Sequence, residues 1–327
     1  MTQSRISRTA AYVAAGRALG AREPDAAARN PDYLAERLLG DPARYDLDLP
    51  IMHALAGTYD EAMQDFEIAG IVCAMNVRAR FVDEALERAV AAGAQQILIL
   101  GAGFDSHAYR YESLLRELRI YEVDQPATQA WKRERVAAVV GAPPPNLRYV
   151  AVDFAAEDLG SALRRHGYDF SQRSFVIMEG VTMYLEESAL RQTLQLLATH
   201  PAGSSVVFDF VSSVMLDMIR RIDLDAVPPT ARAFAERFLH LTRDEPWQFG
   251  FPFREEQKYV EELGFSVSEI LPIGSDDAVR RYLTRADGTR VGREMPVKMP
   301  TPPTAAAREQ MEAMAYKIAE VFVPLRH

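Results

Sequence analysis

Short apolar runs alternate along this chain with longer stretches in which apolar residues recur at helical spacing. The clearest run, at 97–100, has no polar alternation, which is typical of a strand buried on both faces of a parallel sheet. Similar runs follow at 121–123, 148–152, 174–178 and 206–210. The connections between them are long enough for helical crossovers between parallel strands. The pattern predicts an α/β fold with a doubly wound sheet.

The 95 residues before the first run predict helices only. Ser7 begins an Ala-rich helical stretch, Asn30-Pro31-Asp32 predicts a helix start, and an apolar stripe over 81–90 ends at Gly93. We therefore expect residues 1–95 to form a helical N-terminal cap over the open end of a ligand pocket. The alternative is that these helices only add core.

Residues 96–327 are predicted to form the core domain, and the alternation breaks within it after the fifth run. Residues 212–253 have apolar positions at helical spacing and predict a helical insertion over the substrate side, or else extra scaffold. The remainder predicts a short helix over 255–262, closing strands at 265–270 and 280–284, and a last helix over 304–321. We expect one domain with a cap and an insertion.

The end of the first run carries the strongest local signal for a ligand. Gly101-Ala102-Gly103 follows directly, and two glycines there permit a tight turn and a close approach of ligand to backbone. Asp124 ends the second run, at the distance along the chain where a Rossmann-type unit presents a carboxylate to a ribose. Together these residues predict a site for a nucleoside-containing cofactor.

The absence of a third glycine narrows the choice of cofactor. A dinucleotide fingerprint needs a glycine where Ser106 stands, so a cofactor without pyrophosphate, S-adenosyl-L-methionine, is favoured. Asp105 fits this choice, since a carboxylate attracts an ammonium or sulfonium, although it could merely cap the following helix. Acidic residues also end the later runs, at Asp153, Glu179 and Asp209, which together suggest an acidic rim suited to a cationic cofactor.

Composition excludes several classes of protein. The 327 residues carry a net charge of −9 with no basic stripe, which disfavours nucleic acid as a partner. No apolar run approaches the roughly 18 residues of a membrane span. The lone Cys73 rules out a disulfide framework and fits a reducing compartment. We therefore expect a cytoplasmic protein with a small-molecule substrate, no membrane association and possible homo-oligomers.

Several segments match a known family in its order. They are Arg78-Ala79-Arg80-Phe81, the stretch from Leu100 to Arg110, Tyr121-Glu-Val-Asp-Gln-Pro126, Val152-Asp-Phe154 and Glu179-Gly-Val-Thr-Met-Tyr-Leu185. On these residues the sequence resembles the leucine carboxyl methyltransferase family, including bacterial S-adenosyl-L-methionine-dependent methyltransferases of the tetracenomycin polyketide type. The resemblance implies a class I methyltransferase fold, Rossmann-like and doubly wound, with a helical N-terminal cap.

The resemblance also implies roles at the cofactor. Arg78 would hold its carboxylate, Gly101, Ala102 and Gly103 would underlie its methionine portion, and Asp124, with Gln125 beside it, would accept the ribose hydroxyls. Asp153 and Phe154 would frame the adenine, and Glu179 with Gly180 would border the methionine end. Without the resemblance, Arg78 is a helix surface charge paired with Asp83 or Glu84. His107 and Phe154 depart from the Arg and Leu common in relatives.

Methyl transfer is an in-line displacement, so the enzyme's main task is alignment. A carboxylate acceptor needs no general base, whereas a phenol does. His107 is the nearest candidate base and Tyr184 could orient substrate, although a lone histidine at a helix start is more often structural. No metal site, nucleophile elbow or P-loop is evident. We expect an O-methyltransferase acting on a carboxylate or hydroxyl of a small metabolite. The alternatives are an NAD-dependent oxidoreductase and a non-catalytic cofactor-binding protein.

Overall fold

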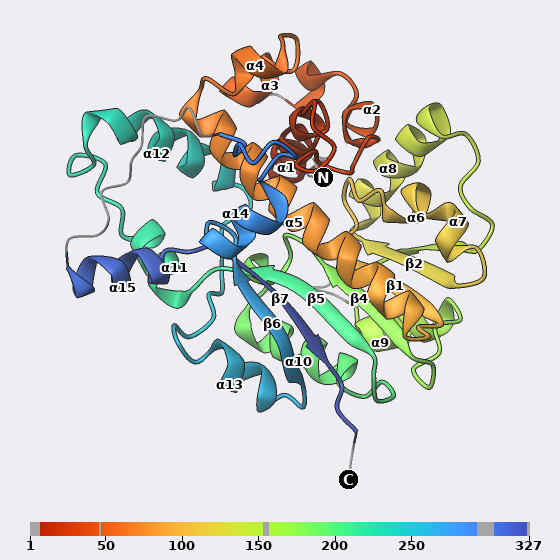
Figure 1. Cartoon of the computed structure of the whole chain (residues 1–327). Coiled ribbons are helices and arrows are strands. Elements are labelled where there is room, and N and C mark those ends of the chain that lie inside the picture. The colour runs from red at the N-terminus through yellow and green to blue at the C-terminus, as the bar shows by residue number, and fades with distance from the viewer. Residues whose placement is uncertain (1–6, 46, 153–156, 293–303, 326–327) are drawn as a thin grey trace.

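A seven-stranded sheet forms the centre of the computed structural model, which describes residues 7–45, 47–152, 157–292 and 304–325 (Figure 1). Its strands lie in the order β3-β2-β1-β4-β5-β7-β6, and their bounds are β1 (Gln96–Leu100), β2 (Arg119–Asp124), β3 (Leu147–Ala151), β4 (Ser174–Met178), β5 (Ser205–Phe210), β6 (Ser266–Pro272) and β7 (Lys317–Phe322). The first five strands are parallel, while β7 runs antiparallel to both of its neighbours. The predicted doubly wound α/β sheet is confirmed.

Helices connect the strands and precede the sheet. The α-helices are α1 (Arg8–Gly20), α2 (Ala35–Leu39), α3 (Pro50–Ala54), α4 (Tyr59–Ala62), α5 (Phe66–Ala91), α6 (His107–Arg110), α7 (Glu112–Leu115), α8 (Pro126–Val139), α9 (Leu159–Arg165), α10 (Glu187–Leu197), α11 (Ser213–Arg220), α12 (Pro229–Thr242), α13 (Glu256–Glu261), α14 (Asp276–Tyr282) and α15 (Ala305–Ala313), with 3-10 turns η1 (Pro42–Tyr45) and η2 (Thr182–Tyr184).

Both faces of the sheet are covered, which explains why its strands lack polar alternation. Along β1, Ile97 and Ile99 belong to one apolar cluster, which includes residues of α5, α8 and the N-terminal helices. Leu98 and Leu100 point the other way into a second cluster, with residues of α9, α10 and α13. Successive strand residues therefore serve two cores, one on each side.

The N-terminal residues form helices α1 to α5. Helices α1 to α4 gather at one end of the sheet, near α12, while the long helix α5 crosses a face of the sheet (Figure 1). Ser7 caps α1 by accepting a hydrogen bond from the Ala10 N–H at 3.1 Å. Asp65 caps the long helix α5, and its side chain accepts hydrogen bonds from the Glu67 and Ile68 N–H groups. The division into a cap, residues 1–95, and a core, residues 96–327, stays a prediction.

Three predicted elements are wrong. Residues 317–322 form the strand β7, paired with β5 and β6, and not the end of a helix. Residues 280–282 end helix α14, whose N-cap Ser275 accepts from the Ala278 N–H, so no strand spans 280–284. The helix expected at Asn30 begins only at Ala35. The Asn30 side chain instead accepts a hydrogen bond from the Asp32 N–H, and the Asp32 side chain accepts one from the Leu34 N–H, which forms a turn before the helix.

Candidate functional site

The turn after β1 has a backbone that only glycine adopts easily. Gly101 has φ +65° and Gly103 φ +36°, both in the left-handed region. A Cβ added to Gly101 would lie 2.5 Å from Val181 Cγ2, which is too close for any side chain. The Ala102 N–H donates to the Val123 carbonyl at 3.0 Å and fastens the turn to the end of β2.

Asp124 lies beside this turn, as the spacing predicted. Its Oδ2 accepts from the Gly103 N–H at 2.5 Å, and its Oδ1 accepts from the Gln125 N–H at 2.6 Å. Burial raises the pKa of Asp124, although these two donors lower it and Glu245 raises it further. The carboxylate is thus fixed by backbone at the rim where the β1 turn meets α8.

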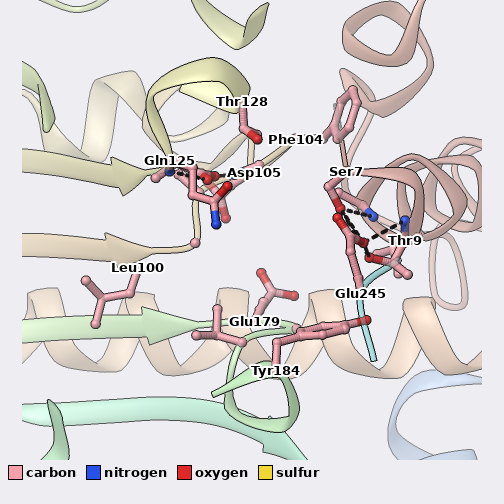
Figure 2. Close-up of a pocket in the computed structure, with 18 of the residues that line it drawn as sticks. Ser7, Thr9, Leu100, Phe104, Asp105, Gln125, Thr128, Glu179, Tyr184 and Glu245 are labelled. Atoms are coloured by element: carbon pink, nitrogen blue, oxygen red, sulfur yellow. Dashed lines mark hydrogen bonds between the residues drawn. The ribbon is translucent and has the colours of Figure 1, made fainter. Parts of the chain in front are cut away.

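A cavity of about 790 Å³ opens at this edge of the sheet (Figure 2). Its volume is that of a small-molecule or cofactor site. Nine of the residues expected at the site line it: Arg78, Gly101, Ala102, Gly103, Asp124, Gln125, Glu179, Gly180 and Tyr184. The structure therefore brings together residues that lie more than 100 positions apart in the sequence.

Arg78 projects from α5 into a buried ionic cluster at the cavity. Its Nε lies 3.0 Å from Glu179 Oε1, and one terminal nitrogen donates to Asp209 Oδ2 at 2.7 Å. The same terminal nitrogen lies 3.2 Å from the Tyr316 hydroxyl, which also donates to Asp209. The alternative role of Arg78, a surface charge paired with Asp83 or Glu84, is wrong, since the side chain is buried and bonded to Glu179 and Asp209.

Asp105 and His107 form a second buried cluster. His107 Nδ1 lies 2.7 Å from Asp105 Oδ2, and Nε2 lies 2.9 Å from Asp83 Oδ1. Burial lowers the pKa of His107, but Asp105 and then Asp83 outweigh it and raise this pKa to about 10. Burial opposes ionisation of Asp105 in turn, and the imidazolium lowers the pKa of that carboxyl.

This environment argues against His107 as a general base. Its ring is held as a cation between two carboxylates, and it does not line the cavity. Asp105 does line the cavity, and its Oδ1 also accepts from the His107 N–H, which supports its role at the start of the helix, but its pairing with His107 offsets the charge that was expected to attract the cofactor. Asp105, His107 and Glu179 come close enough for a metal, but both imidazole nitrogens already face carboxylates, so these residues do not suit one.

A wall of the cavity that the sequence did not predict joins the start of α1 to the segment after α12. Glu245 Oε2 accepts from the Ser7 hydroxyl at 3.0 Å, from the Thr9 hydroxyl and from the Thr9 N–H at 3.4 Å (Figure 2). Tyr184 lies next to Glu245 in the same view, and burial raises its pKa. No local pattern signals these contacts, because they join residues 236 or 238 positions apart.

Two expected site residues, Asp153 and Phe154, lie outside the described residues. Asp209 belongs to the acidic rim but is fully buried, with its Oδ1 accepting from the Gly180 N–H at 2.7 Å. The sequence indicated Asp209 only by its position at the end of a predicted strand, and gave no indication that it pairs with Arg78.

The residues present fit a sulfonium nucleoside. The glycine turn lines the cavity without side chains at Gly101 and Gly103, so a ligand can approach the backbone closely, and Asp124 stands at its rim with an acceptor for a sugar hydroxyl. Arg78 supplies a guanidinium whose second terminal nitrogen makes no hydrogen bond to the described residues, which leaves a donor for a carboxylate.

Comparisons with known proteins agree with this geometry. A model of the family described as leucine carboxyl methyltransferase matches residues 10–198. A relative from Mycobacterium tuberculosis (strain H37Rv), provisionally named an S-adenosyl-L-methionine-dependent methyltransferase, is 32% identical over 239 residues, which cover 72% of this chain and 71% of that protein. A relative from Bacillus subtilis with the same provisional name is 28% identical over 59% of this chain, and the match spans 61% of its own length.

Among solved structures, a provisionally named methyltransferase from Thermobifida fusca is 16% identical, with a TM-score of 0.48, over 94% of this chain and 97% of that one. A magnesium protoporphyrin IX methyltransferase from Synechocystis, with TM-score 0.43 and 12% identity, covers 79% of this chain and 87% of its own.

Among the described residues, no helix is long and apolar enough to cross a membrane.

Proposed function

The chain belongs to the leucine carboxyl methyltransferase family and is an S-adenosyl-L-methionine-dependent methyltransferase, and we propose that it methylates an oxygen atom of a small metabolite. The acceptor oxygen is a carboxylate or a hydroxyl, on a polyketide-like or other secondary metabolite. A cytoplasmic location, a possible homo-oligomer and the absence of nucleic acid partners belong to the same proposal.

One observation carries this proposal: the cavity is continuous from the glycine turn and Asp124 to the wall formed by Ser7, Thr9 and Glu245. It therefore has room for a cofactor at the strand ends and for an acceptor under the N-terminal helices. The segment 212–253 contributes Asp244, Glu245 and Gln248 to the lining, which supports a substrate-side role for the insertion.

Within this proposal, each residue has a role that its contacts allow. Arg78 binds the cofactor carboxylate, the turn 101–103 underlies its methionine portion, and Asp124 with Gln125 binds the ribose. Glu179 and Gly180 border the methionine end, where the Glu179 carboxylate favours the ammonium. When bound, the cofactor supplies a methyl group already activated by the positive sulfur, so the protein's residues act mainly by alignment and by excluding water.

Calorimetric titration of the purified protein with S-adenosyl-L-homocysteine and, separately, with NADH tests the cofactor assignment. We expect binding of S-adenosyl-L-homocysteine that is lost in Asp124→Ala and retained in Glu112→Ala, an exposed position on α7 outside the cavity. Binding of NADH alone would favour the oxidoreductase alternative and contradict the assignment.

The acceptor is tested by incubating the protein and a metabolite extract with the methyl donor labelled in its methyl group. Mass spectrometry of the labelled products distinguishes a methyl ester, which hydrolyses in mild base, from a methyl ether, which does not. Cofactor binding without labelling of any extract component would instead support a non-catalytic binding protein.

A further inference from the structure

The cavity as a whole carries a marked excess of acid. The described side chains that line the cavity include six carboxylates and two guanidiniums; the acids are Asp105, Asp124, Glu179, Glu186, Asp244 and Glu245, and the bases are Arg17 and Arg78. Both arginines are already paired with acids. Arg17 lies 3.0 Å from Asp32, and Arg78 is shared between Glu179 and Asp209.

The acids divide between the two ends of the cavity. Asp105 is paired with His107, and Asp124 and Glu179 lie at the strand ends where the cofactor is proposed to bind. Glu245 lies at the other end, between Tyr184 and the residues that begin α1 (Figure 2). No arginine or lysine that lines the described cavity is left to balance it.

Glu245 is held in a way that presents one oxygen to a ligand. All three of its hydrogen bonds, from the Ser7 hydroxyl, the Thr9 hydroxyl and the Thr9 N–H, end on Oε2. Its Oε1 accepts no hydrogen bond from the described residues. Because these three donors all bind Oε2 and Glu245 lines the cavity, Oε1 is left as an acceptor for a ligand.

Resting on the proposed function, we infer that the acceptor is a hydroxyl compound without net negative charge, and that Glu245 Oε1 binds and receives its hydroxyl proton. A carboxylate acceptor would be repelled by Glu245 and would find no unpaired cation among the described lining residues. A hydroxyl, in contrast, donates to Oε1 and is thereby oriented.

The step balances without a further reactant. The acceptor's O–H bond breaks and an O–CH₃ bond forms, while the methyl group's bond to sulfur breaks and its electron pair stays on sulfur. The proton passes to Glu245 and from there to solvent. Because the oxygen becomes strongly acidic as it gains the methyl group, a carboxylate is a sufficient base. His107, which is buried as a cation, is not needed for this step.

Charge selection is tested by ligand-observed NMR on protein saturated with S-adenosyl-L-homocysteine. The probes are three phenols that differ in one substituent: tyramine, 4-hydroxyphenylacetamide and 4-hydroxyphenylacetate. We expect the carboxylate probe to bind at least ~10-fold more weakly than the other two, since like charges a few ångströms apart at a partly screened site repel by more than ~1 kcal/mol. Glu245→Gln should narrow this gap, and the control Glu112→Gln should keep it.

Proton transfer is tested with the labelled methyl donor and the probe that binds tightest. Glu245→Gln should lower kcat by ~100-fold or more while the affinity for S-adenosyl-L-homocysteine stays within ~2-fold of wild type. A methyl ester formed from 4-hydroxyphenylacetate, or a variant that keeps most of its kcat, would overturn the inference. Probes that bind but are not methylated would overturn the proton transfer.

The two proposals fail in different ways. If S-adenosyl-L-homocysteine binds but the carboxylate probe binds as well as tyramine, or no probe binds, the methyltransferase stands and this inference falls. If S-adenosyl-L-homocysteine does not bind, the cofactor site itself is misplaced and both fall. Circular dichroism of Glu245→Gln confirms that the variant is folded, since it keeps an amide oxygen for Ser7 and Thr9.

Discussion

The buried cluster around His107 makes a quantitative prediction about stability. His107 is 3% exposed and lies between Asp105 at 2.7 Å and Asp83 at 2.9 Å. The rise of its pKa from 6.5 to about 10 corresponds to roughly 5 kcal/mol of stabilisation of the charged form, at ~1.36 kcal/mol per pKa unit. His107→Gln removes this cation and leaves Asp105 buried without its main partner.

We expect His107→Gln to lower the free energy of unfolding at pH 7 by about 3–5 kcal/mol, the usual cost of breaking a buried ion pair. Asp83 loses less than Asp105, because Arg110 still binds it through two contacts of 2.8 Å. The measurement is urea unfolding followed by circular dichroism and by tryptophan fluorescence, with coincident transitions. The matched control is His53→Gln, whose pair with Asp48 is largely exposed and should leave the midpoint unchanged.

The stabilisation that His107 provides should also change with pH in a defined direction. Because folding raises the pKa of His107, its contribution is full below about pH 6.5 and is lost as pH rises toward about 10. The difference in unfolding free energy between wild type and His107→Gln should therefore be large at pH 6 and much smaller at pH 10. A difference under ~1 kcal/mol at pH 7, or one that does not change between pH 6 and pH 10, would refute the reasoning.

Three further predictions concern the cavity. Gly101→Ala should weaken binding of S-adenosyl-L-homocysteine by at least ~10-fold in calorimetry, because its Cβ meets Val181 and its φ is strained; Val181→Ala in the same chain should restore part of the loss. Arg78→Lys should lower stability by about 3 kcal/mol or more and abolish cofactor binding, since one ammonium cannot replace the contacts to Glu179 and Asp209; an unaltered titration would contradict this. Tyr184→Phe should keep cofactor affinity and folding while changing KM for the acceptor, which steady-state kinetics measures.

The sequence predicted those elements whose cause is local. The strand 97–100 was predictable because a residue run buried on both faces is apolar throughout, and the turn after it because Gly101 and Gly103 must adopt positive φ. Asp124 followed from its spacing to that turn. Helix α14 was missed, although Ser275 with two aspartates after it is an ordinary helix start.

Other features depend on partners far away in the sequence. In β7, the pattern of 317–322 suits either a helix or a strand, and pairing with β5 and β6 decides it. Two of its polar residues are buried only because distant elements pair with them: Lys317 lies 2.6 Å from Glu256, and Glu320 lies 2.7 Å from Arg88. The contact of Glu245 with Thr9 is of the same kind. Such residues have no local signature, so a sequence pattern cannot find them.

The acidic rim shows how the structure changes a correct idea. In the sequence, the carboxylates of the rim are equivalent, since each lies at the end of a predicted strand or just after it. In the structure, they differ in the groups that they contact. Asp105 is neutralised by His107, and Asp209 is fully buried against Arg78, so neither contributes a free charge to the cavity. Among the described residues, Asp124 accepts hydrogen bonds from backbone N–H groups only, so no side chain occupies its remaining lone pairs and they can accept from a ligand. Attraction for a cationic cofactor therefore comes from a few fixed carboxylates, and Glu245 extends the same sign of charge to the side where the acceptor is proposed to bind.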